Sequence, residues 1–295
     1  MNKMLARLLM VAFCSALVPA ATHAAGPSEI RFATEAGYPP FEFLDPSGEL
    51  QGFDIDIGNE ICKRLNAKCV WIDQSFDSLI PGLQARKFDL ANSTMTATEA
   101  RAKVIDFSEP MYIVPVRLAA RKGSGLEPTA ESLKGKRVGV QQGTTMETYA
   151  RQNWANNGVT IVAYPSYTDA FNDLAGGRVD ATFQEAQNAV EGFLTKPAGA
   201  DFELTGSTVD DSPILNEPIA MGIRKGNKKL KKTVDEVLRQ DLRIEQVELP
   251  HQADARGQQR IGDRNAQGHG ADQAAEKNQH SHVVVSGIRV WLLRL

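Results

Sequence analysis

The chain has 295 residues, of which 42% are hydrophobic, 7% aromatic and 23% charged, and its formal net charge is −3 at pH 7. A dedicated nucleic-acid-binding protein normally carries a strong basic excess, so this charge balance argues against that class. The apolar content argues against wholesale disorder, and the length suits two domains of about 100–200 residues each.

The first 24 residues have the organisation of a secretory signal peptide. Lys3 and Arg7 are their only charged residues, an apolar run follows at 8–18, and mostly small residues close the segment at 20–24. The apolar run is too short to cross about 30 Å of hydrocarbon as a helix. We therefore expect residues 1–24 to be cleaved, and the mature protein to be exported without spanning the membrane.

Two cysteines, Cys62 and Cys69, remain after the signal peptide. An even number of cysteines in an exported protein favours a disulfide. A metal site is the weaker alternative, because no nearby histidine or further cysteine completes a coordination set.

The first half of the body alternates strand-like and helical patterns. Residues 30–34 alternate apolar and polar side chains, whereas Ile57, Ile61 and Leu65 recur at helical spacing. The expected elements are a strand at 30–34, a helix at 55–65, a strand at 69–72, a short helix at 76–83, a strand at 88–91 and a helix start at 98–101. This rhythm predicts an α/β domain with a largely parallel sheet.

The same pattern then starts again. The expected elements are a strand at 137–140, a polar turn at 141–145, a helix at 146–153, a strand at 160–163, a helix at 167–174, a strand at 179–183 and a helix from 185. A strand at 218–224 and a helix at 230–239 follow. We therefore expect a discontinuous lobe 1 (25–114 and 218–242), with hinge strands and lobe 2 at 115–217. Small polar ligands in such folds bind at the carboxyl ends of strands and at helix N-termini.

The composition changes from residue 243 onward. Residues 251–282 are crowded with Gln, Asp, Arg, Gly, Asn and Ala, lack apolar periodicity, and hold four of the five histidines. A metal-binding tract is one interpretation, but the spacings match no compact ligand set. We expect 243–295 to be a disordered tail, or a tail translated in an altered reading frame.

The body between signal peptide and tail contains no histidine. A Ser-His-Asp or Cys-His hydrolase and a His-ligated zinc enzyme are therefore hard to build there. The sequence also lacks a GxxxxGK[ST] phosphate loop and a GxGxxG motif after a strand. We accordingly expect a protein that is not an enzyme, with no catalytic residue, cofactor or metal.

Four motifs follow one another in the body: TEAGYPPF (34–41), GFDIDI (52–57), FDSLIP (76–81) and LKGKRVGV (133–140). Together they resemble the periplasmic polar amino-acid-binding proteins of ABC importers, solute-binding protein family 3. Within that family they most resemble the lysine/arginine/ornithine-, arginine- and histidine-binding group. The resemblance covers roughly residues 28–240. It implies a two-lobed periplasmic binding protein fold of type II, with the ligand in the interlobe cleft, and it agrees with a Cys62–Cys69 disulfide.

The resemblance also implies how the backbone of an amino acid would be held. Arg101 matches the position that grips the α-carboxylate, and its planar fork suits bidentate pairing. The other implied contacts are Ser93, Thr94 and Thr96 in a strand-end segment, Gln142, Thr144 and Thr145 at a helix N-terminus, and Glu185 for the α-ammonium. Helix capping by the threonines, and solvated positions for Arg101 and Glu185, are the alternatives.

A second group of residues would select the ligand's side chain. Tyr38 and Phe76 match the two aromatic walls that hold the aliphatic stem or guanidinium, although core packing is the alternative for Phe76. Glu35 matches the acidic position for a cationic head group, and its carboxylate directly after a strand needs a partner or water. Gln141 stands where many relatives carry an apolar residue, which leaves arginine, lysine, ornithine and histidine open.

The expected function is capture of a basic L-amino acid by lobe closure, and its delivery by a monomer to an inner-membrane ABC permease complex. Nucleic acid is not an expected partner. One alternative on the same fold is a periplasmic cyclohexadienyl dehydratase, with Glu185 or Glu35 as general acid, although its dicarboxylate substrate would be repelled by two cleft glutamates. The other is a polar-amino-acid sensor module, for which the sequence supplies no output domain.

Overall fold

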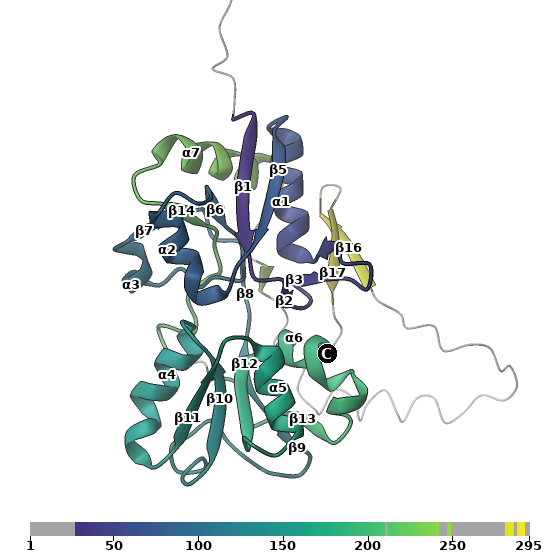
Figure 1. The fold of residues 1–295 in the computed structure, drawn as a ribbon, viewed down its shortest axis with the longest axis vertical. Coiled ribbons are helices and arrows are strands. Elements are labelled where there is room, and N and C mark those ends of the chain that lie inside the picture. The colour runs from purple at the N-terminus through teal and green to yellow at the C-terminus, as the bar shows by residue number, and fades with distance from the viewer. Residues whose placement is uncertain (1–26, 210–211, 242–246, 249–280, 286–287, 293–295) are drawn as a thin grey trace, which may run out of the picture.

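The computed structural model describes residues 27–209, 212–241, 247–248, 281–285 and 288–292. It shows two α/β lobes, one above the other, each with a five-stranded sheet and flanking helices (Figure 1). The predicted two-lobed α/β fold class is therefore confirmed. The proposed signal peptide lies outside the described residues. Within the described part of the chain, no helix has the length and apolar character needed to cross a bilayer.

The sheet of the first lobe is largely parallel, as predicted, with one strand reversed. In spatial order its strands are β5 (Lys68–Asp73), β1 (Glu29–Thr34), β6 (Leu90–Ala91), β14 (Gly222–Arg224) and β7 (Ile105–Phe107). β1 runs parallel to β5 and β6, whereas β14 runs antiparallel to β6 and β7. The reason is that β14 returns from the second lobe and therefore enters the sheet from the opposite end.

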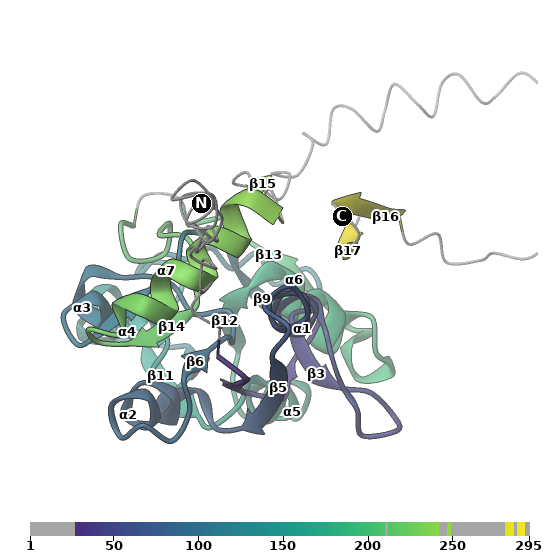
Figure 2. The ribbon, with the colours of Figure 1, turned by 90° about the horizontal axis from the view of Figure 1, so that it is seen from above.

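Two apolar clusters cover the two faces of this sheet. Phe32 and Leu90 belong to one cluster, and the neighbouring residues Ala33 and Ala91 belong to the other, as the alternation of side chains along a strand requires. The helices of this lobe are α1 (Phe53–Arg64), α2 (Leu79–Gln84), α3 (Glu99–Ala102) and α7 (Lys228–Glu236). Seen from above, α7 and α2 lie on opposite sides of β6 and β14 (Figure 2).

The first helix, α1, begins at a position that only glycine fits. Gly52 has φ 126°, and a Cβ there would lie 2.2 Å from the carbonyl oxygen of Phe41. Acidic residues occupy the first turn of α1 and basic residues its last turn, which complements the helix dipole. A disulfide joins Cys62 near the end of α1 to Cys69 in β5, with 5.7 Å between the Cα atoms, so the predicted disulfide is confirmed.

The sheet of the second lobe is also mixed. Its strands, in spatial order, are β11 (Thr160–Tyr164), β10 (Arg137–Gln141), β12 (Ala181–Glu185), β9 (Val116–Arg121) and β13 (Phe202–Thr205). β10 is parallel to β11 and β12, and β9 is antiparallel to β12 and β13. The flanking helices are α4 (Thr145–Asn153), α5 (Tyr167–Ala175) and α6 (Ala186–Ala189), which continues as a π-helical turn at Val190–Leu194. Trp154, Tyr167 and Phe183 are the largest fully buried side chains of this lobe.

The chain crosses between the lobes twice. The first crossing leads from β8 (Tyr112–Ile113) to β9, and the second leads from β13 back to β14. The two crossings lie against each other, because Tyr112 and Ile219 form an antiparallel bridge. Paired strands of this kind allow the lobes to move relative to each other as rigid bodies.

Several elements were not predicted from the sequence. A three-stranded sheet, β2 (Gly37–Tyr38), β3 (Glu42–Leu44) and β4 (Leu50–Gln51), follows β1 and leads into α1. Short 3-10 turns occur at Phe76–Ser78, Ala155–Asn157 and Pro197–Gly199, and a π-helical turn at Val237–Asp241 follows α7. The proposed tail, 243–295, lies mostly outside the described residues. Its described parts are β15 (Val247–Glu248), which pairs with β8, and the paired strands β16 (Ser281–Val285) and β17 (Ile288–Leu292).

Candidate functional site

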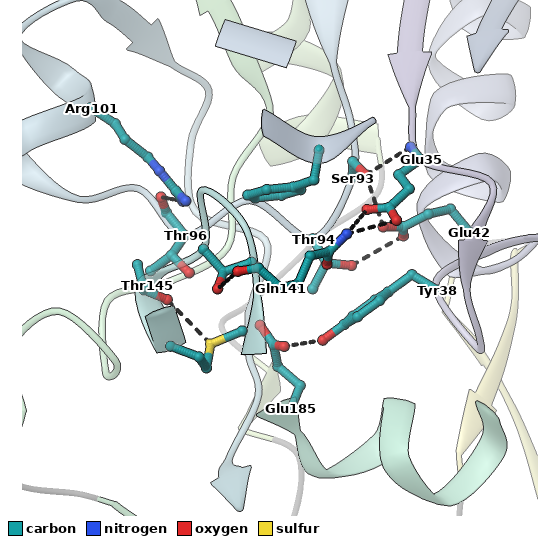
Figure 3. A pocket seen from close by; sticks show the side chains of 13 residues that line it. Glu35, Tyr38, Glu42, Ser93, Thr94, Thr96, Arg101, Gln141, Thr145 and Glu185 are labelled. Carbon is teal, nitrogen blue, oxygen red and sulfur yellow. Dashed lines mark hydrogen bonds between the residues drawn. The ribbon is translucent and has the colours of Figure 1, made fainter. Parts of the chain in front are cut away.

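A polar pocket lies between the lobes, where strands of both sheets end. The ends of β1 and β6 bring Glu35 and Ser93 to it from the first lobe, and the ends of β10 and β12 bring Gln141 and Glu185 from the second. Figure 3 shows these side chains converging. About 290 Å³ of space, open solvent included, lies between its lining side chains. Its lining residues are Glu35, Tyr38, Glu42, Phe76, Ser93, Thr94, Thr96, Arg101, Gln141, Thr144, Thr145, Met146 and Glu185.

All the predicted site residues except Gln142 line this pocket. Gln142 follows the end of β10 directly, so its side chain points away from the side on which Gln141 lies and is exposed. Its backbone N–H donates to the carbonyl of Tyr164. Gln142 is thus the one predicted site residue that does not line the pocket.

Glu35 spans the boundary between the lobes. Its carboxylate accepts hydrogen bonds from the Gln141 side-chain amide at 2.7 and 2.6 Å, and Gln141 also donates to the carbonyl of Pro165. The Glu35 backbone N–H donates to Ser93 Oγ at 3.0 Å. Burial raises the pKa of Glu35 to about 7, against the opposing effect of the Gln141 hydrogen bond. Glu35 therefore presents hydrogen-bond acceptors to the pocket.

A second cross-lobe hydrogen bond joins the two residues at the other side of the pocket. The Tyr38 hydroxyl donates to Glu185 Oε2, so a residue of β2 contacts the last residue of β12. Burial raises the pKa of both Tyr38 and Glu185, while the Tyr38 hydrogen bond and the Arg101 charge act to lower the pKa of Glu185. The Tyr38 ring also packs against Tyr167, with 5.7 Å between ring centroids.

Arg101 brings a half-buried cation to the pocket. Its guanidinium donates to the carbonyls of Thr96 at 2.8 Å and, across the lobes, of Gly143 at 2.9 Å. It lies 5.3 Å from the centroid of the Phe76 ring. Burial lowers the pKa of Arg101 to about 10, against the opposing charge of Glu185. No ion pair within 4.0 Å holds Arg101 among the described residues, so its charge is available to an anionic group.

The threonines of the site divide between local and pocket roles. Thr98, rather than Thr96, caps α3, because its Oγ1 accepts the Arg101 backbone N–H. Thr144 caps α4: its Oγ1 accepts the Glu147 N–H at 3.1 Å and donates to the Gln141 carbonyl at 2.7 Å. Thr145 opens α4 at the pocket, where the backbone N–H groups of a helix N-terminus favour an anion.

Two lining residues, Glu42 and Met146, were missed by the sequence analysis. Met146 is simply the neighbour of Thr145 in the first turn of α4. Glu42 accepts hydrogen bonds from the hydroxyls of Ser93 at 3.0 Å and Thr94 at 3.1 Å. A glutamate between two phenylalanines, as in the sequence FEF at 41–43, was the available signal. Charged residues are almost never fully buried without a partner, so this pattern marks a candidate for a polar network.

The described residues offer no metal centre, since no group of three or more His, Cys, Asp or Glu side chains among them could hold an ion. The polar groups of the pocket instead suit a small zwitterion. Arg101 and the N-terminus of α4 can bind an anionic group, while Glu35 and Glu185 can bind cationic ones.

Two α/β lobes, two chain crossings and a polar pocket at the strand ends between the lobes are the architecture of a solute-binding protein. Comparison with protein families agrees. The chain belongs to the bacterial extracellular solute-binding proteins, family 3, whose model matches residues 30–243.

Named relatives cover most of the chain. It is 44% identical over 229 residues to the lysine/arginine/ornithine-binding periplasmic protein of Escherichia coli K12. The matched region covers 78% of this chain and 87% of that protein. It is 43% identical over 227 residues to the histidine-binding periplasmic protein of the same strain, with 77% and 86% covered.

Solved structures give the same result for the fold. An ancestral arginine-binding protein bound to arginine superposes with a TM-score of 0.67 at 35% identity, and covers 72% of this chain and 91% of that one. The holo form of ArgBP from T. maritima superposes with a TM-score of 0.65 at 34% identity, and the match covers 72% of this chain and 89% of that one.

Proposed function

We propose that this protein captures a basic L-amino acid in the pocket between its lobes. The single observation that carries the proposal is the separation of charge around the pocket. Arg101 stands on one side and Glu35 on the other, so a molecule lying between them meets a cation at one end and a carboxylate at the other (Figure 3). A basic amino acid has the matching charges. Relatives named for lysine, arginine, ornithine and histidine support this ligand class.

The pocket assigns a role to each part of such a ligand. The α-carboxylate pairs with Arg101 and lies at the N-terminus of α4, by Thr145. The α-ammonium pairs with Glu185. The aliphatic stem packs between Phe76 and Tyr38, and the cationic head group reaches Glu35. In this arrangement the ligand takes over hydrogen-bonding groups that now join the two lobes.

The proposed role of the protein is transport. Closure of the second lobe over a ligand held by the first would create one compact shape, which a membrane-bound ABC permease complex can distinguish from the open protein. Export by a cleaved signal peptide at 1–24 would place the monomer in the periplasm, as the names of its relatives suggest. The relatives are binding proteins rather than enzymes, which disfavours the dehydratase alternative.

Calorimetric titration of the purified protein tests the ligand class. L-Arginine, L-lysine, L-ornithine and L-histidine are compared with L-glutamine and L-glutamate. We expect binding of at least one basic amino acid and much weaker binding of glutamate, because Glu35 and Glu185 repel a second carboxylate. A protein that binds no basic amino acid, or that prefers glutamate, contradicts the proposal.

Substitution of Glu35 tests the role of the head-group carboxylate. Glu35→Gln is expected to weaken binding of the preferred basic amino acid about 30-fold, or about 2 kcal/mol, because it removes a charged partner. Binding of L-glutamine should change much less. Glu49→Gln, on an exposed turn of the same lobe, is the matched control. Equal losses of affinity for cationic and neutral ligands would show that Glu35 does not bind the cationic head group.

A further inference from the structure

The acidic side of the pocket contains a second carboxyl group, Glu42, which the roles above leave unused. Glu42 lies on β3, is only 1% exposed, and lines the pocket next to Glu35 (Figure 3). Its two carboxyl oxygens contact two hydroxyl groups, those of Ser93 and Thr94. Both hydroxyls belong to residues that also line the pocket.

The groups around Glu42 and Glu35 are acidic or neutral. Those that face Glu42 are Asp54 of α1, Tyr112 of β8, Tyr38 of β2 and Glu35 itself. Those that face Glu35 are Asp73 of β5, Asp77 of the 3-10 turn, Asp169 of α5 and Gln141 of β10. Across the described residues, no Lys, Arg or His forms an ion pair with Glu35, Glu42 or Asp54. Several carboxylates buried together without a cation are unfavourable, so some of these groups hold a proton.

Glu42 and Asp54 form a buried pair of carboxyl groups, and their hydrogen bonds indicate which of the two holds the proton. Asp54 accepts the Thr94 backbone N–H at 2.8 Å and the Tyr112 hydroxyl at 2.7 Å, and these two donors favour its ionised form. Glu42 has only hydroxyl partners, and burial together with the Asp54 charge raises the pKa of Glu42 well above its usual range. Glu42 is therefore the member of the pair that is protonated first.

Hydroxyl partners can serve both states of Glu42, because their hydrogens rotate. A protonated Glu42 donates to one hydroxyl, whose own hydrogen then turns elsewhere. An ionised Glu42 accepts hydrogen bonds from the hydroxyls of both Ser93 and Thr94. Because both hydroxyl hydrogens are then used, these two hydroxyls can only accept hydrogen bonds from a group in the pocket. Ser93 Oγ already accepts the Glu35 N–H with one of its lone pairs. Ionisation of Glu42 thus makes this wall of the pocket a pure acceptor, suited to the N–H groups of a cation.

We propose that Glu42 is a second acid for the cationic head group of the ligand, and that binding exchanges that cation for a proton held by Glu42 and Glu35. This inference rests on the proposed function. In the exchange a carboxyl O–H bond breaks, the proton passes to the buffer, and N–H groups of the cation form hydrogen bonds to the carboxylate and to Ser93 and Thr94. The charge of the site stays the same. Glu42 acts partly through these hydroxyls and is therefore a positioning residue.

The exchange predicts proton release and a pH-dependent affinity. Below the pKa of the carboxyl groups a proton must leave before the cation can bind, so affinity rises with pH, by up to tenfold per pH unit for each proton released. The rise should level off only when both carboxyl groups are ionised in the free protein, and therefore not below the pKa of Glu35, about 7. Calorimetric titration with L-arginine and L-lysine at pH 6, in two buffers of different ionisation enthalpy, measures the protons released. We expect about one proton for each ligand bound.

Glu42→Gln separates the contribution of Glu42 from that of Glu35. The amide has nearly the same shape but cannot ionise, so it should lower both the affinity for L-arginine, about tenfold, and the number of protons released. Glu49→Gln is again the matched control and should match the unsubstituted protein. If Glu42→Gln does not fold, Glu35→Gln gives the answer instead, because it should still release protons from Glu42.

Each outcome of these titrations decides a different point. Failure of the unsubstituted protein to bind any basic amino acid contradicts the proposed function itself. Binding without proton release, and with an affinity that is constant from pH 5 to 8, overturns the exchange and leaves the function standing. Unchanged proton release and affinity in Glu42→Gln, or no release at all in Glu35→Gln, overturns the part assigned to Glu42.

Discussion

The two lobes contribute to the pocket in different ways. In the first lobe, Ser93, Thr94 and Glu42 are held by hydrogen bonds to one another and to Asp54, all within that lobe. In the second lobe, Gln141 and Glu185 instead direct their side chains across the cleft, to Glu35 and Tyr38. The first lobe therefore presents a preorganised half-site, whereas the second lobe completes the site by contact.

This difference suggests an order of events. A ligand that first meets the first lobe finds most of its partners already in place, so little ordering entropy is lost at that step. The second lobe then exchanges its bonds to Glu35 and Tyr38 for bonds to the ligand. Substitutions in the first lobe should accordingly change affinity strongly, and those that affect only contact between the lobes should change it weakly.

The largest effect is expected from Arg101→Ala in the first lobe. Among the described residues, Arg101 is the only basic one that lines the pocket, and its loss leaves the ligand's carboxylate without a charged partner. We expect the dissociation constants of all bound amino acids to rise at least 100-fold, or about 3 kcal/mol, with Arg101→Lys intermediate. Titration calorimetry measures this change. A loss below tenfold would mean that the helix N-terminus of the second lobe dominates carboxylate binding.

The disulfide distinguishes the two lobes in stability. Replacing Cys62 and Cys69 with serine should cost the first lobe about 2.5 kcal/mol, the chain-entropy value for so short a loop. Trp71 lies in the first lobe and Trp154 in the second. Two variants that each keep one of these tryptophans, with the other tryptophans changed to phenylalanine, therefore report the urea unfolding of each lobe by fluorescence. Equal destabilisation at both tryptophans would show that the lobes unfold as one unit.

Glu185→Gln should have a smaller effect, about tenfold on binding, because it removes the charge that faces the α-ammonium but keeps a hydrogen-bond acceptor. Tyr38→Phe removes the hydroxyl that donates to Glu185 and leaves the aromatic wall, so we expect a loss of only a few-fold. Titrations of both variants with the same ligand rank the two effects. The reverse ranking would assign Glu185 to lobe contact rather than to the ligand.

The smallest effect is expected from Asn188→Ala. Asn188 of α6 donates to the carbonyl of Pro39 at 3.1 Å across the lobes, and neither residue lines the pocket. Loss of this bond should weaken all ligands equally by a few-fold, or about 0.5–1 kcal/mol, mainly through faster dissociation. Stopped-flow dissociation rates test this, with the surface variant Asn153→Ala as control. A change in ligand preference would contradict a role confined to closure.

Most of the fold could be predicted because the strands and helices carry clear apolar periodicity. The alternation at 30–34 predicted β1, and the spacing of Ile57 and Ile61 predicted α1. The direction of β14 could not be predicted in the same way, since a short apolar segment carries no sign of which neighbour it will pair with. The short sheet β2–β4 was missed because two- and three-residue strands are too brief to show a period.

The candidate site was predicted largely through the family resemblance, and the exceptions have physical reasons. Strand alternation separates Gln142 from Gln141, although the two are neighbours in the sequence. Glu42 was missed because its importance lies in its burial and in its proximity to Asp54, which come together only when β3 packs beside α1. The roles of the lining residues as ligand contacts remain predictions, which the titrations above address.

The position of β14 has a consequence for how the protein is made. β14 lies between β6 and β7, so β7 has no place in the sheet until residue 224 has left the ribosome. The second lobe, in contrast, has all its strands between Val116 and Thr205. Its shorter-range contacts favour earlier folding, while the first lobe must wait for the returning chain. In a chain that crosses a membrane unfolded, such late completion of one lobe would lengthen the time during which translocation is possible.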